Sequence, residues 1–368
     1  MQDIEAITGT VLWLAVAIGA TFGFVGSRTR FCTMGAISDV VHMGDWNRMR
    51  MWMLAMATAV AGTTALQLAG LLDASKTIYT GSRLAWLSHL VGGAAFGAGM
   101  TLASGCGART LIRIGGGNLK SVVVFAFFAI SALMTMRGLF GVWRARFLDP
   151  VAIALPHGQD LPAFLAAGGF APSTALVAAA AALAVPLLIA ALRRREAWTA
   201  DILVGGIVTG TLVVAGWYVT GHLGHLAEHP DTLDEAFLAT SSNRAESLTF
   251  VAPLAYALDL LMLWSDASRV LSFGVASAGG VVAGAAVHAV LSGSFRIESF
   301  RDADDLVRHI AGAVLMGFGG VTALGCTIGQ GISGLSTLAL GAMLTTAAII
   351  LGAAVTMKLQ YHLMARAA

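Results

Sequence analysis

Charged residues and prolines are both scarce in this chain of 368 residues. Lysine, arginine, aspartate and glutamate make up only 11% of the sequence, whereas they reach roughly a quarter of a typical soluble domain. Because so few charges cannot cover a water-facing surface, the composition excludes a soluble globular protein. The 22 basic and 20 acidic residues nearly cancel, and nothing in that balance points to a nucleic-acid partner.

Apolar residues take the place of the missing charges. They form 57% of the chain, and the mean hydropathy is +0.80. A helix needs about 20 apolar residues to cross a bilayer, and ten segments approach that length: 9–27, 50–72, 85–104, 119–137, 171–192, 202–220, 248–264, 270–292, 305–324 and 331–357. The alternating strands of a membrane β-barrel are absent. We therefore predict an all-α integral membrane protein with nine or ten transmembrane helices and short re-entrant helices.

The position of the arginines gives an expected orientation. The first ten residues are acidic and lack the basic start of a cleavable signal peptide, so the first span is expected to be a permanent helix. Arg28, Arg30, Arg48 and Arg50 follow it, and residues 193–195 are three arginines. The positive-inside rule puts both groups on the cytoplasmic side of a bacterial inner membrane. Loops 221–247 and 293–304 would then lie outside.

One segment of the chain recurs at an offset of 220 residues. Residues 89–106 align with 309–326 without a gap, and seven of eighteen positions are identical, including a histidine at the start and Gly-Cys at the end. Two Ala/Gly-rich helices can share glycines by chance, but the shared histidine and cysteine favour a duplication. We therefore divide a single membrane domain, 1–368, into a first half (1–140), a linking segment (141–200) and a second half (201–368).

A weaker echo connects the segments upstream of this repeat. Gly19 and Gly23 have the same spacing as Gly206 and Gly210, but Cys32 falls opposite Val219 and has no counterpart. Internal repeats are common in transporters, whose substrate sites lie between the halves. Six predicted spans separate the two repeated helices, which would make the repeat parallel. A re-entrant segment among them would make it inverted.

Each repeated segment carries a stripe of small residues on one helical face that runs from its histidine to its cysteine. Small residues allow a neighbouring helix to approach closely, so the stripe is explained either by packing alone or by a narrow passage that ends at the cysteine. Gly105, Gly107 and Gly325 flank the two cysteines. Glycine permits a break there, and the N–H groups that open a following helix attract anions.

Three cysteines are the candidate chemical groups: Cys32, Cys106 and Cys326. A free cysteine is often only a small buried hydrophobe. The odd number argues against disulfide pairing, and the absence of Cys-x-x-Cys spacing argues against a zinc or iron–sulfur site. We expect no metal and no cofactor.

Other polar residues near the cysteines are weaker candidates. Thr33, Thr327 and Gln330 could donate hydrogen bonds to a ligand. Electrostatic roles are conceivable for Arg28, Arg30, Arg109, His89 and His309. The arginines are equally explained as membrane-interface anchors, and the histidines as local helix-end contacts.

The sequence resembles the YeeE/YedE family of sulfur-transport membrane proteins. The resemblance is carried by GSRTRFCTMGAISD (26–39), FGAGMTLASGCGARTL (96–111), SLTFVAPL (247–254) and residues 295–334, where GCTIGQGISG is the most specific stretch. It implies an hourglass of about nine spanning helices in pseudo-symmetric halves, with Cys32, Cys106 and Cys326 at a central constriction. It also implies thiosulfate as the substrate, relayed by S–H hydrogen bonds, and a small soluble sulfur-carrier partner on the cytoplasmic side.

Two other functions fit the same residues. A membrane sulfurtransferase would carry a persulfide on Cys106, and a channel would pass another small sulfur or selenium anion. We expect a transporter that is not an enzyme. The chain has no G-x-x-x-x-G-K-[ST] loop, so direct use of ATP is not expected.

Overall fold

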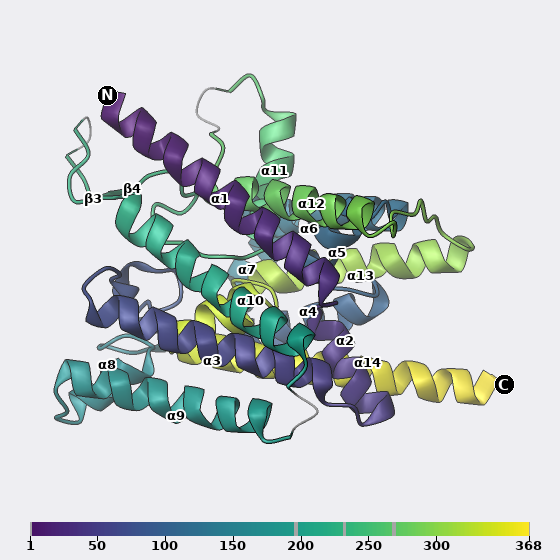
Figure 1. Ribbon diagram of the computed structural model, residues 1–368, viewed down its shortest axis with the longest axis horizontal. Coiled ribbons are helices and arrows are strands. Elements are labelled where there is room, and N and C mark those ends of the chain that lie inside the picture. The colour runs from purple at the N-terminus through teal and green to yellow at the C-terminus, as the bar shows by residue number, and fades with distance from the viewer. Residues whose placement is uncertain (1, 195–197, 231–232, 267–269, 368) are drawn as a thin grey trace.

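The computed structural model describes residues 2–194, 198–230, 233–266 and 270–367. Arg195, the last residue of the predicted cytoplasmic arginine triplet, lies outside this set. Long helices packed side by side form the molecule, and its N- and C-termini lie at opposite ends of the long axis (Figure 1).

The first part of the chain alternates long helices with short ones. Its elements are α1 (Gln2–Arg28), α2 (Thr33–Ser38), η1 (Asp39–Met43), α3 (Asn47–Leu68), η2 (Ala74–Lys76), α4 (Trp86–Leu102), α5 (Gly107–Gly115), α6 (Leu119–Arg137), α7 (Leu139–Phe147), α8 (Leu161–Ala167) and α9 (Pro172–Leu192). β1 (Arg83–Leu84) pairs with β2 (Ile153–Ala154) in an antiparallel ribbon.

The second part repeats that alternation. It contains α10 (Ala200–Tyr218), η4 (Val219–Leu223), α11 (Ala252–Met262), α12 (Phe273–Leu291), α13 (Ala303–Thr322), η5 (Gly329–Gly334) and α14 (Leu340–Ala367). A second antiparallel ribbon joins β3 (His225–Leu226) to β4 (Ala236–Phe237).

The structure confirms an all-α membrane protein. Within the described residues, eight helical segments are long and apolar enough to cross a bilayer. The span expected over 248–264 corresponds to α11, whose 11 residues are too few to cross by themselves. The span expected over 305–324 corresponds to the 20-residue helix α13, which carries Asp304 and Asp305 in its first turn and is not among the eight.

Helices α4 and α13, which carry the repeat, cross through their glycine stripes. A Cβ added to Gly92 would lie 2.7 Å from the carbonyl oxygen of Gly319, and one added to Gly312 would lie 2.6 Å from that of Gly99. Such contacts leave no room for a side chain. The predicted close approach is therefore confirmed, and the glycine stripe of α4 packs against the glycine stripe of α13.

The upstream glycines of the weaker echo also make helix contacts. Gly19 and Gly23 of α1 face the α12 backbone at Ser277 and Val281, while Gly206 and Gly210 of α10 face Leu54 and Ala55–Ala59 of α3. Helix α1, the first long helix of the first half, thus packs on α12 of the second half. Helix α10, the first long helix of the second half, packs on α3 of the first half. These reciprocal contacts agree with a duplication, and the division into two halves remains a prediction.

The direction of the repeat follows from the same contacts. Moving along α4 from Gly92 to Gly99, the facing residues on α13 move backwards from Gly319 to Gly312. The two repeated helices therefore run antiparallel. This is the arrangement of an inverted repeat and not of the parallel repeat that the predicted span count suggested.

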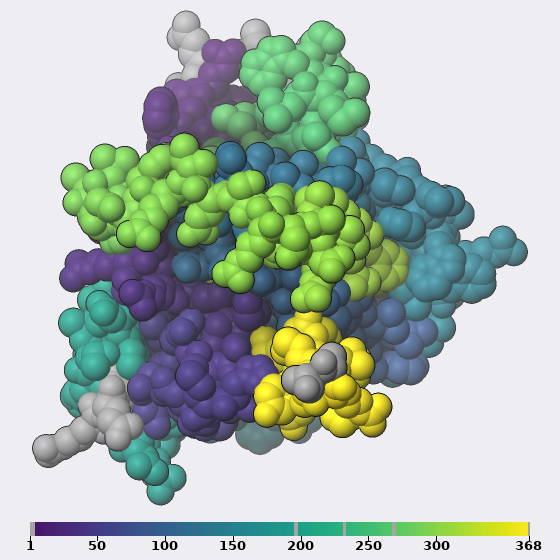
Figure 2. Space-filling view, turned by 90° about the vertical axis from the view of Figure 1, so that its right-hand side faces the viewer, coloured from purple at the N-terminus to yellow at the C-terminus, as the bar shows by residue number. Residues whose placement is uncertain are grey.

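One part of the predicted orientation is wrong. Loop 293–304 was expected on the opposite side from Arg30, yet Arg296 and Arg301 line the same cavity as Arg30. Figure 2 shows this face, where the light-green segment after α12 crosses over the blue α5–α6 region. The error arose because six crossings were assumed between α4 and α13. Helix α11 is too short to supply one of them.

Candidate functional site

The three cysteines occupy the same kind of helix break. The preceding helices end at Arg28, Leu102 and Thr322, four residues before each cysteine. The residues two positions before them have left-handed φ angles: Arg30 at 54°, Ser104 at 57° and Leu324 at 60°. A left-handed residue that closes a helix is ordinarily glycine, because other residues pay a steric penalty there.

Hydrogen bonds repeat in all three breaks. The N–H groups of Phe31, Gly105 and Gly325 each donate to the carbonyl five residues earlier, at 2.8–3.1 Å. This is the six-to-one bond of a Schellman motif. Each cysteine carbonyl then accepts the first bond of the following helical segment, from Ala36, Thr110 and Gln330 at 2.8–2.9 Å. Cys32 had no counterpart in the sequence repeat, but its helix break has the same local structure as the breaks at Cys106 and Cys326.

Cys32 is the N-cap of α2, and its Sγ accepts a hydrogen bond from the Gly35 N–H at 3.3 Å. The side chain of Arg48 lies over Gly35, where its Nη1 would be 2.3 Å from an added Cβ. Asp39 fixes this guanidinium through a 2.7 Å ion pair with Nε. A positive charge is thereby held close to the first cysteine.

Cys106 is the N-cap of α5 and is almost fully buried. Its thiol lies beside the Thr327 hydroxyl and the Arg109 N–H, and close enough to Cys32 and Cys326 to interact with both electrostatically. Cys106 therefore lies in the same region of the molecule as Cys32 and Cys326. Thr327 was predicted as a site residue because it follows Cys326. Its hydroxyl lies beside Cys106, the other cysteine of the repeat.

Cys326 is fully buried. Its Sγ accepts from the Gly329 N–H at 3.4 Å and also contacts the N–H groups of Phe250 and Ile328 and the Thr249 hydroxyl. The N–H groups around this sulfur come from a loop and from the start of the helical segment that includes η5. They provide partial positive charge without a formal cation.

Two further predicted residues lie near the cysteines but have unequal hydrogen bonding. Gln330 is buried and donates from Nε2 to the Ala323 carbonyl at 2.6 Å, while its Oε1 has no partner among the described residues. Thr33, next to Cys32, is buried, and its hydroxyl likewise has no partner in the described part of the chain. A buried polar atom without a partner is costly, and a transient ligand can supply that partner.

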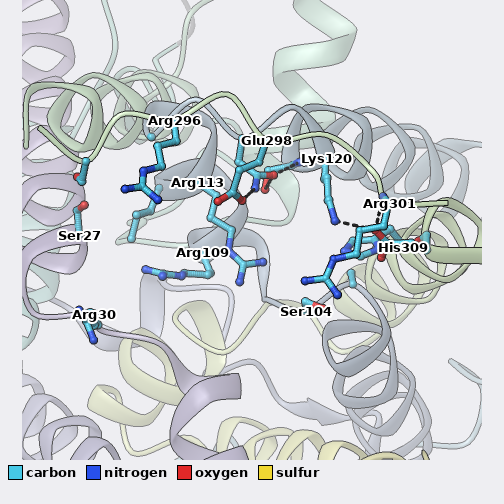
Figure 3. Close-up of a pocket in the computed structure, with 17 residues that line it drawn as sticks. Ser27, Arg30, Ser104, Arg109, Arg113, Lys120, Arg296, Glu298, Arg301 and His309 are labelled. Atoms are coloured by element: carbon cyan, nitrogen blue, oxygen red, sulfur yellow. Dashed lines mark hydrogen bonds and ion pairs between the residues drawn. The ribbon is translucent and has the colours of Figure 1, made fainter. Parts of the chain in front are cut away.

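A basic cavity of about 640 Å³ opens on one side of the cysteines. Its wall includes Ala103, Ser104 and Arg109, which flank Cys106, and its cationic residues are Arg30, Arg109, Arg113, Lys120, Arg296 and Arg301. Figure 3 shows these side chains converging from several segments of the chain. The carboxylates in the wall are Glu298 and Asp305. Cations outnumber them, so the field inside favours anions.

Both carboxylates are already engaged. Glu298 Oε2 accepts from the Asn118 amide at 2.6 Å, and Asp305 pairs with Lys120 at 2.6 Å. The Lys120 ammonium and the Arg301 N–H, both hydrogen-bonded to Asp305, hold the pKa of this half-buried carboxyl below its usual range, with Lys120 the larger cause. The arginines of the cavity are left as the groups that face an incoming anion.

Smaller cavities open on the other side of the cysteines. One, of about 150 Å³, is lined by Tyr79, Glu246 and Thr249 among others, and we call it the Glu246 cavity. An adjoining cavity of about 220 Å³ shares Thr249 with it and reaches Gly325, the residue before Cys326. The hourglass shape with a central constriction, which the family resemblance implied, remains a prediction.

The remaining predicted residues lie away from the cysteines. His89 is buried near the start of α4, where Nδ1 pairs with the Thr345 hydroxyl at 2.7 Å. It lies roughly 20 Å along the helix from Leu102, the last residue of α4 before the Cys106 break, at about 1.5 Å per residue. His309 donates from Nδ1 to the Asp305 carbonyl at 2.7 Å, which is the local contact considered for it, and it also lines the basic cavity. Arg28 is exposed.

Sequence reasoning missed several residues that the structure places at the site. Thr249 and Phe250 touch Cys326, and a Cβ on Gly107 would lie 2.7 Å from the Phe250 carbonyl oxygen. Phe250 therefore sits between the segments of Cys106 and Cys326. The only signal for it was its place in the SLTFVAPL stretch. Asp39 was marked only by its place in the 26–39 stretch and Arg48 only as a cytoplasmic positive charge, because their approach to Cys32 depends on the α2–α3 turn.

The fold defines the chain as a multi-pass membrane protein, and its largest described cluster of cations lines a cavity whose field favours anions. Comparison with known proteins names its relatives. The family described as "Sulphur transport" matches residues 28–355. A thiosulfate transporter TsuA from Spirochaeta thermophila is 23% identical over 365 residues, covering 93% of this chain and 97% of the relative. The thiosulfate transporter TsuA of Escherichia coli K12 is 26% identical over 324 residues, covering 85% and 84%.

Because the family match spans most of the chain, this protein belongs to the sulphur transport family. The resemblance found in the four sequence segments is thereby confirmed.

Proposed function

We propose that this chain is a bacterial inner-membrane transporter that takes up thiosulfate, or a closely related sulfur anion, through a constriction formed by Cys32, Cys106 and Cys326. The observation that supports the proposal is the electrostatic contact of Cys106 with Cys32 and Cys326, together with a basic cavity lined by the residues around Cys106 and a smaller cavity that reaches Gly325. The names of both relatives support the substrate.

The mechanism follows from the chemistry of the thiol. A neutral thiol is a weak donor, and a path must bind its ion weakly enough to release it. Thiolates would repel a dianion, and burial in apolar surroundings favours the neutral thiol. The anion would pass between the basic cavity and the opposite cavities and exchange S–H hydrogen bonds from one cysteine to the next. Thr33, Thr327 and Gln330 would add polar contacts.

A relay of this kind involves no covalent step, and in this respect the proposal differs from a sulfurtransferase. A sulfurtransferase would retain a sulfur atom on Cys106 as a persulfide. The basic cavity would serve either function, whereas three adjacent thiols in one path favour passage. The small soluble sulfur-carrier partner on the cytoplasmic side is a further part of the proposal that rests on the family resemblance.

Uptake of labelled thiosulfate into proteoliposomes tests the proposal. The wild type should accumulate label, and each of Cys32→Ala, Cys106→Ala and Cys326→Ala should reduce the rate by at least about tenfold, the change produced by a loss of 1.4 kcal/mol. Full uptake by the triple variant would sink the relay. A stable mass increase of one sulfur on Cys106 after incubation with thiosulfate would favour the sulfurtransferase instead.

A further inference from the structure

The Glu246 cavity differs in charge from the basic cavity on the other side of the cysteines. Its wall contains one carboxylate, that of Glu246, and no lysine or arginine. Thr249 lies in the same wall and touches Cys326. A dianion that passes Cys326 on this side must therefore move along a cavity whose one formal charge is also negative.

The Glu246 side chain is held in place by its own loop. Its Oε1 accepts the N–H groups of Ser241 and Ser242 at 3.0 and 2.9 Å and the Ser242 hydroxyl at 2.7 Å. The Thr220 hydroxyl donates to the Glu246 carbonyl, and so the backbone is fixed as well. The carboxylate is thus a rigid part of the cavity wall and not a mobile surface charge.

No cation compensates the carboxylate within the described part of the chain. Arg244, on the same loop, donates to the Thr77 carbonyl, and Lys76 pairs with Glu235. The neighbouring His222 stacks on Tyr218 and lines a different cavity, on the far side of Ala245. The titratable side chains that share the wall with Glu246 are two tyrosines, Tyr79 and Tyr256, and Arg144 of the adjoining cavity is paired with Asp149.

We propose that Glu246 is a charge gate of the transport path, which slows a dianion beside Cys326 when ionised and admits it when protonated. The inference rests on the proposed function. It adds a residue that sets the rate and the pH dependence of passage. A charge of like sign at close range raises the free energy of the ion in the cavity, and protonation removes that term.

The titration of Glu246 has a defined direction. Burial, the larger cause, raises the pKa of its carboxyl, while hydrogen bonds from Ser242 and Ser241 oppose the rise. Because the pKa is raised, protonation begins at a higher pH than for an exposed glutamate. Transport should therefore increase as pH falls through the range in which Glu246 takes up its proton.

Counterflow of labelled thiosulfate between equal-pH compartments tests the gate without a proton gradient. As pH falls from about 8 toward the ordinary titration range of a glutamate carboxyl, wild-type exchange should rise on the order of fivefold. Glu246→Gln, which cannot ionise, should be fast and nearly independent of pH. Glu246→Asp should retain pH dependence, which shows that the carboxyl and not the size of the side chain matters.

Ser242→Ala supplies a second measurement that does not remove the carboxyl. Loss of the hydroxyl donor destabilises the ionised form, so the midpoint of the pH profile should move to higher pH. An unchanged midpoint, or a Glu246→Gln profile equal to that of the wild type, overturns the gate while leaving thiosulfate transport intact. Absence of thiosulfate exchange by the wild type at every pH overturns the proposed function and the gate together.

Discussion

Ser104 and Leu324 have the same left-handed backbone conformation, with φ of 57° and 60°, two residues before Cys106 and Cys326. Both close a long glycine-striped helix, and both direct the chain into a new helical segment that starts at the cysteine. Arg30 makes the same turn before Cys32. Strained backbone conformations concentrate at functional sites, and here they set the place of each thiol.

Relief of this strain should be measurable. Leu324→Gly removes the Cβ that disfavours the left-handed region, at a site where the leucine side chain is half exposed. We expect a gain of about 1 kcal/mol in stability, seen as a higher thermal midpoint in detergent. Leu324→Val, β-branched at the same φ, should lower the midpoint. Equal losses in both variants would show that the side chain and not the backbone sets the stability there.

Close helix crossing can be tested within a single helix, α12. A Cβ on Gly284 would lie 1.9 Å from the Ala20 carbonyl oxygen, whereas one on Gly279 meets nothing within 4 Å. Gly284→Ala should therefore destabilise the protein by about 1–3 kcal/mol or more, as overpacking does. Gly279→Ala should be neutral or slightly stabilising. Thermal unfolding of both purified variants gives the comparison, and matching midpoints would contradict the packing of α1 on α12.

The hydrogen-bonding role of the thiols predicts a graded series at Cys326. Cys326→Ser keeps a donor at the position and should retain part of the uptake, whereas Cys326→Ala removes it and should reduce the rate by at least about tenfold. Initial rates of labelled thiosulfate uptake decide between them. If serine is as damaging as alanine, the relay depends on a property of sulfur other than hydrogen-bond donation.

The Arg48–Asp39 pair should act on passage at Cys32. Arg48→Gln removes the positive charge held over Gly35 and should raise the KM for thiosulfate by about three- to tenfold, the range expected from losing one nearby charge at partial exposure. Arg48→Lys keeps the charge but loses the planar group, so its effect should be intermediate. Equal KM values in all three proteins would assign Arg48 to structure alone.

The basic cavity should act through long-range attraction. Arg296→Gln is expected to raise the KM severalfold at low ionic strength, and the difference from wild type should shrink as salt is added because surface fields are screened. Arg146→Gln, on helix α7 and not in the cavity wall, is the matched control and should change neither value. A salt-independent effect of Arg296→Gln would point to direct positioning of the ion.

Several features were accessible from the sequence because they depend on local composition. The scarcity of charge required a membrane environment, and the runs of apolar residues located most of the helices. The repeat around Cys106 and Cys326 was visible because identical glycines, histidines and cysteines stand at one fixed offset. The close approach of the glycine stripes followed from side-chain size.

Other features depended on which helices meet and in which direction. The antiparallel crossing of α4 and α13 could not be derived from the count of apolar segments, since α11 is too short to cross by itself. This error placed loop 293–304 on the wrong side. The basic cavity was hidden for the same reason, because its arginines come from segments that are distant in the chain.

The sequence by itself determined that this protein is a helical bundle in a bilayer with three sparse cysteines, two of them at glycine-rich breaks, because hydropathy and residue size act locally along the chain. Only the tertiary structure decided that Cys32 joins the repeated pair, that Arg48 and Phe250 stand beside the thiols, and that opposite charges line the two sides. Those relations arise from contacts between segments far apart in sequence, which neither composition nor spacing encodes.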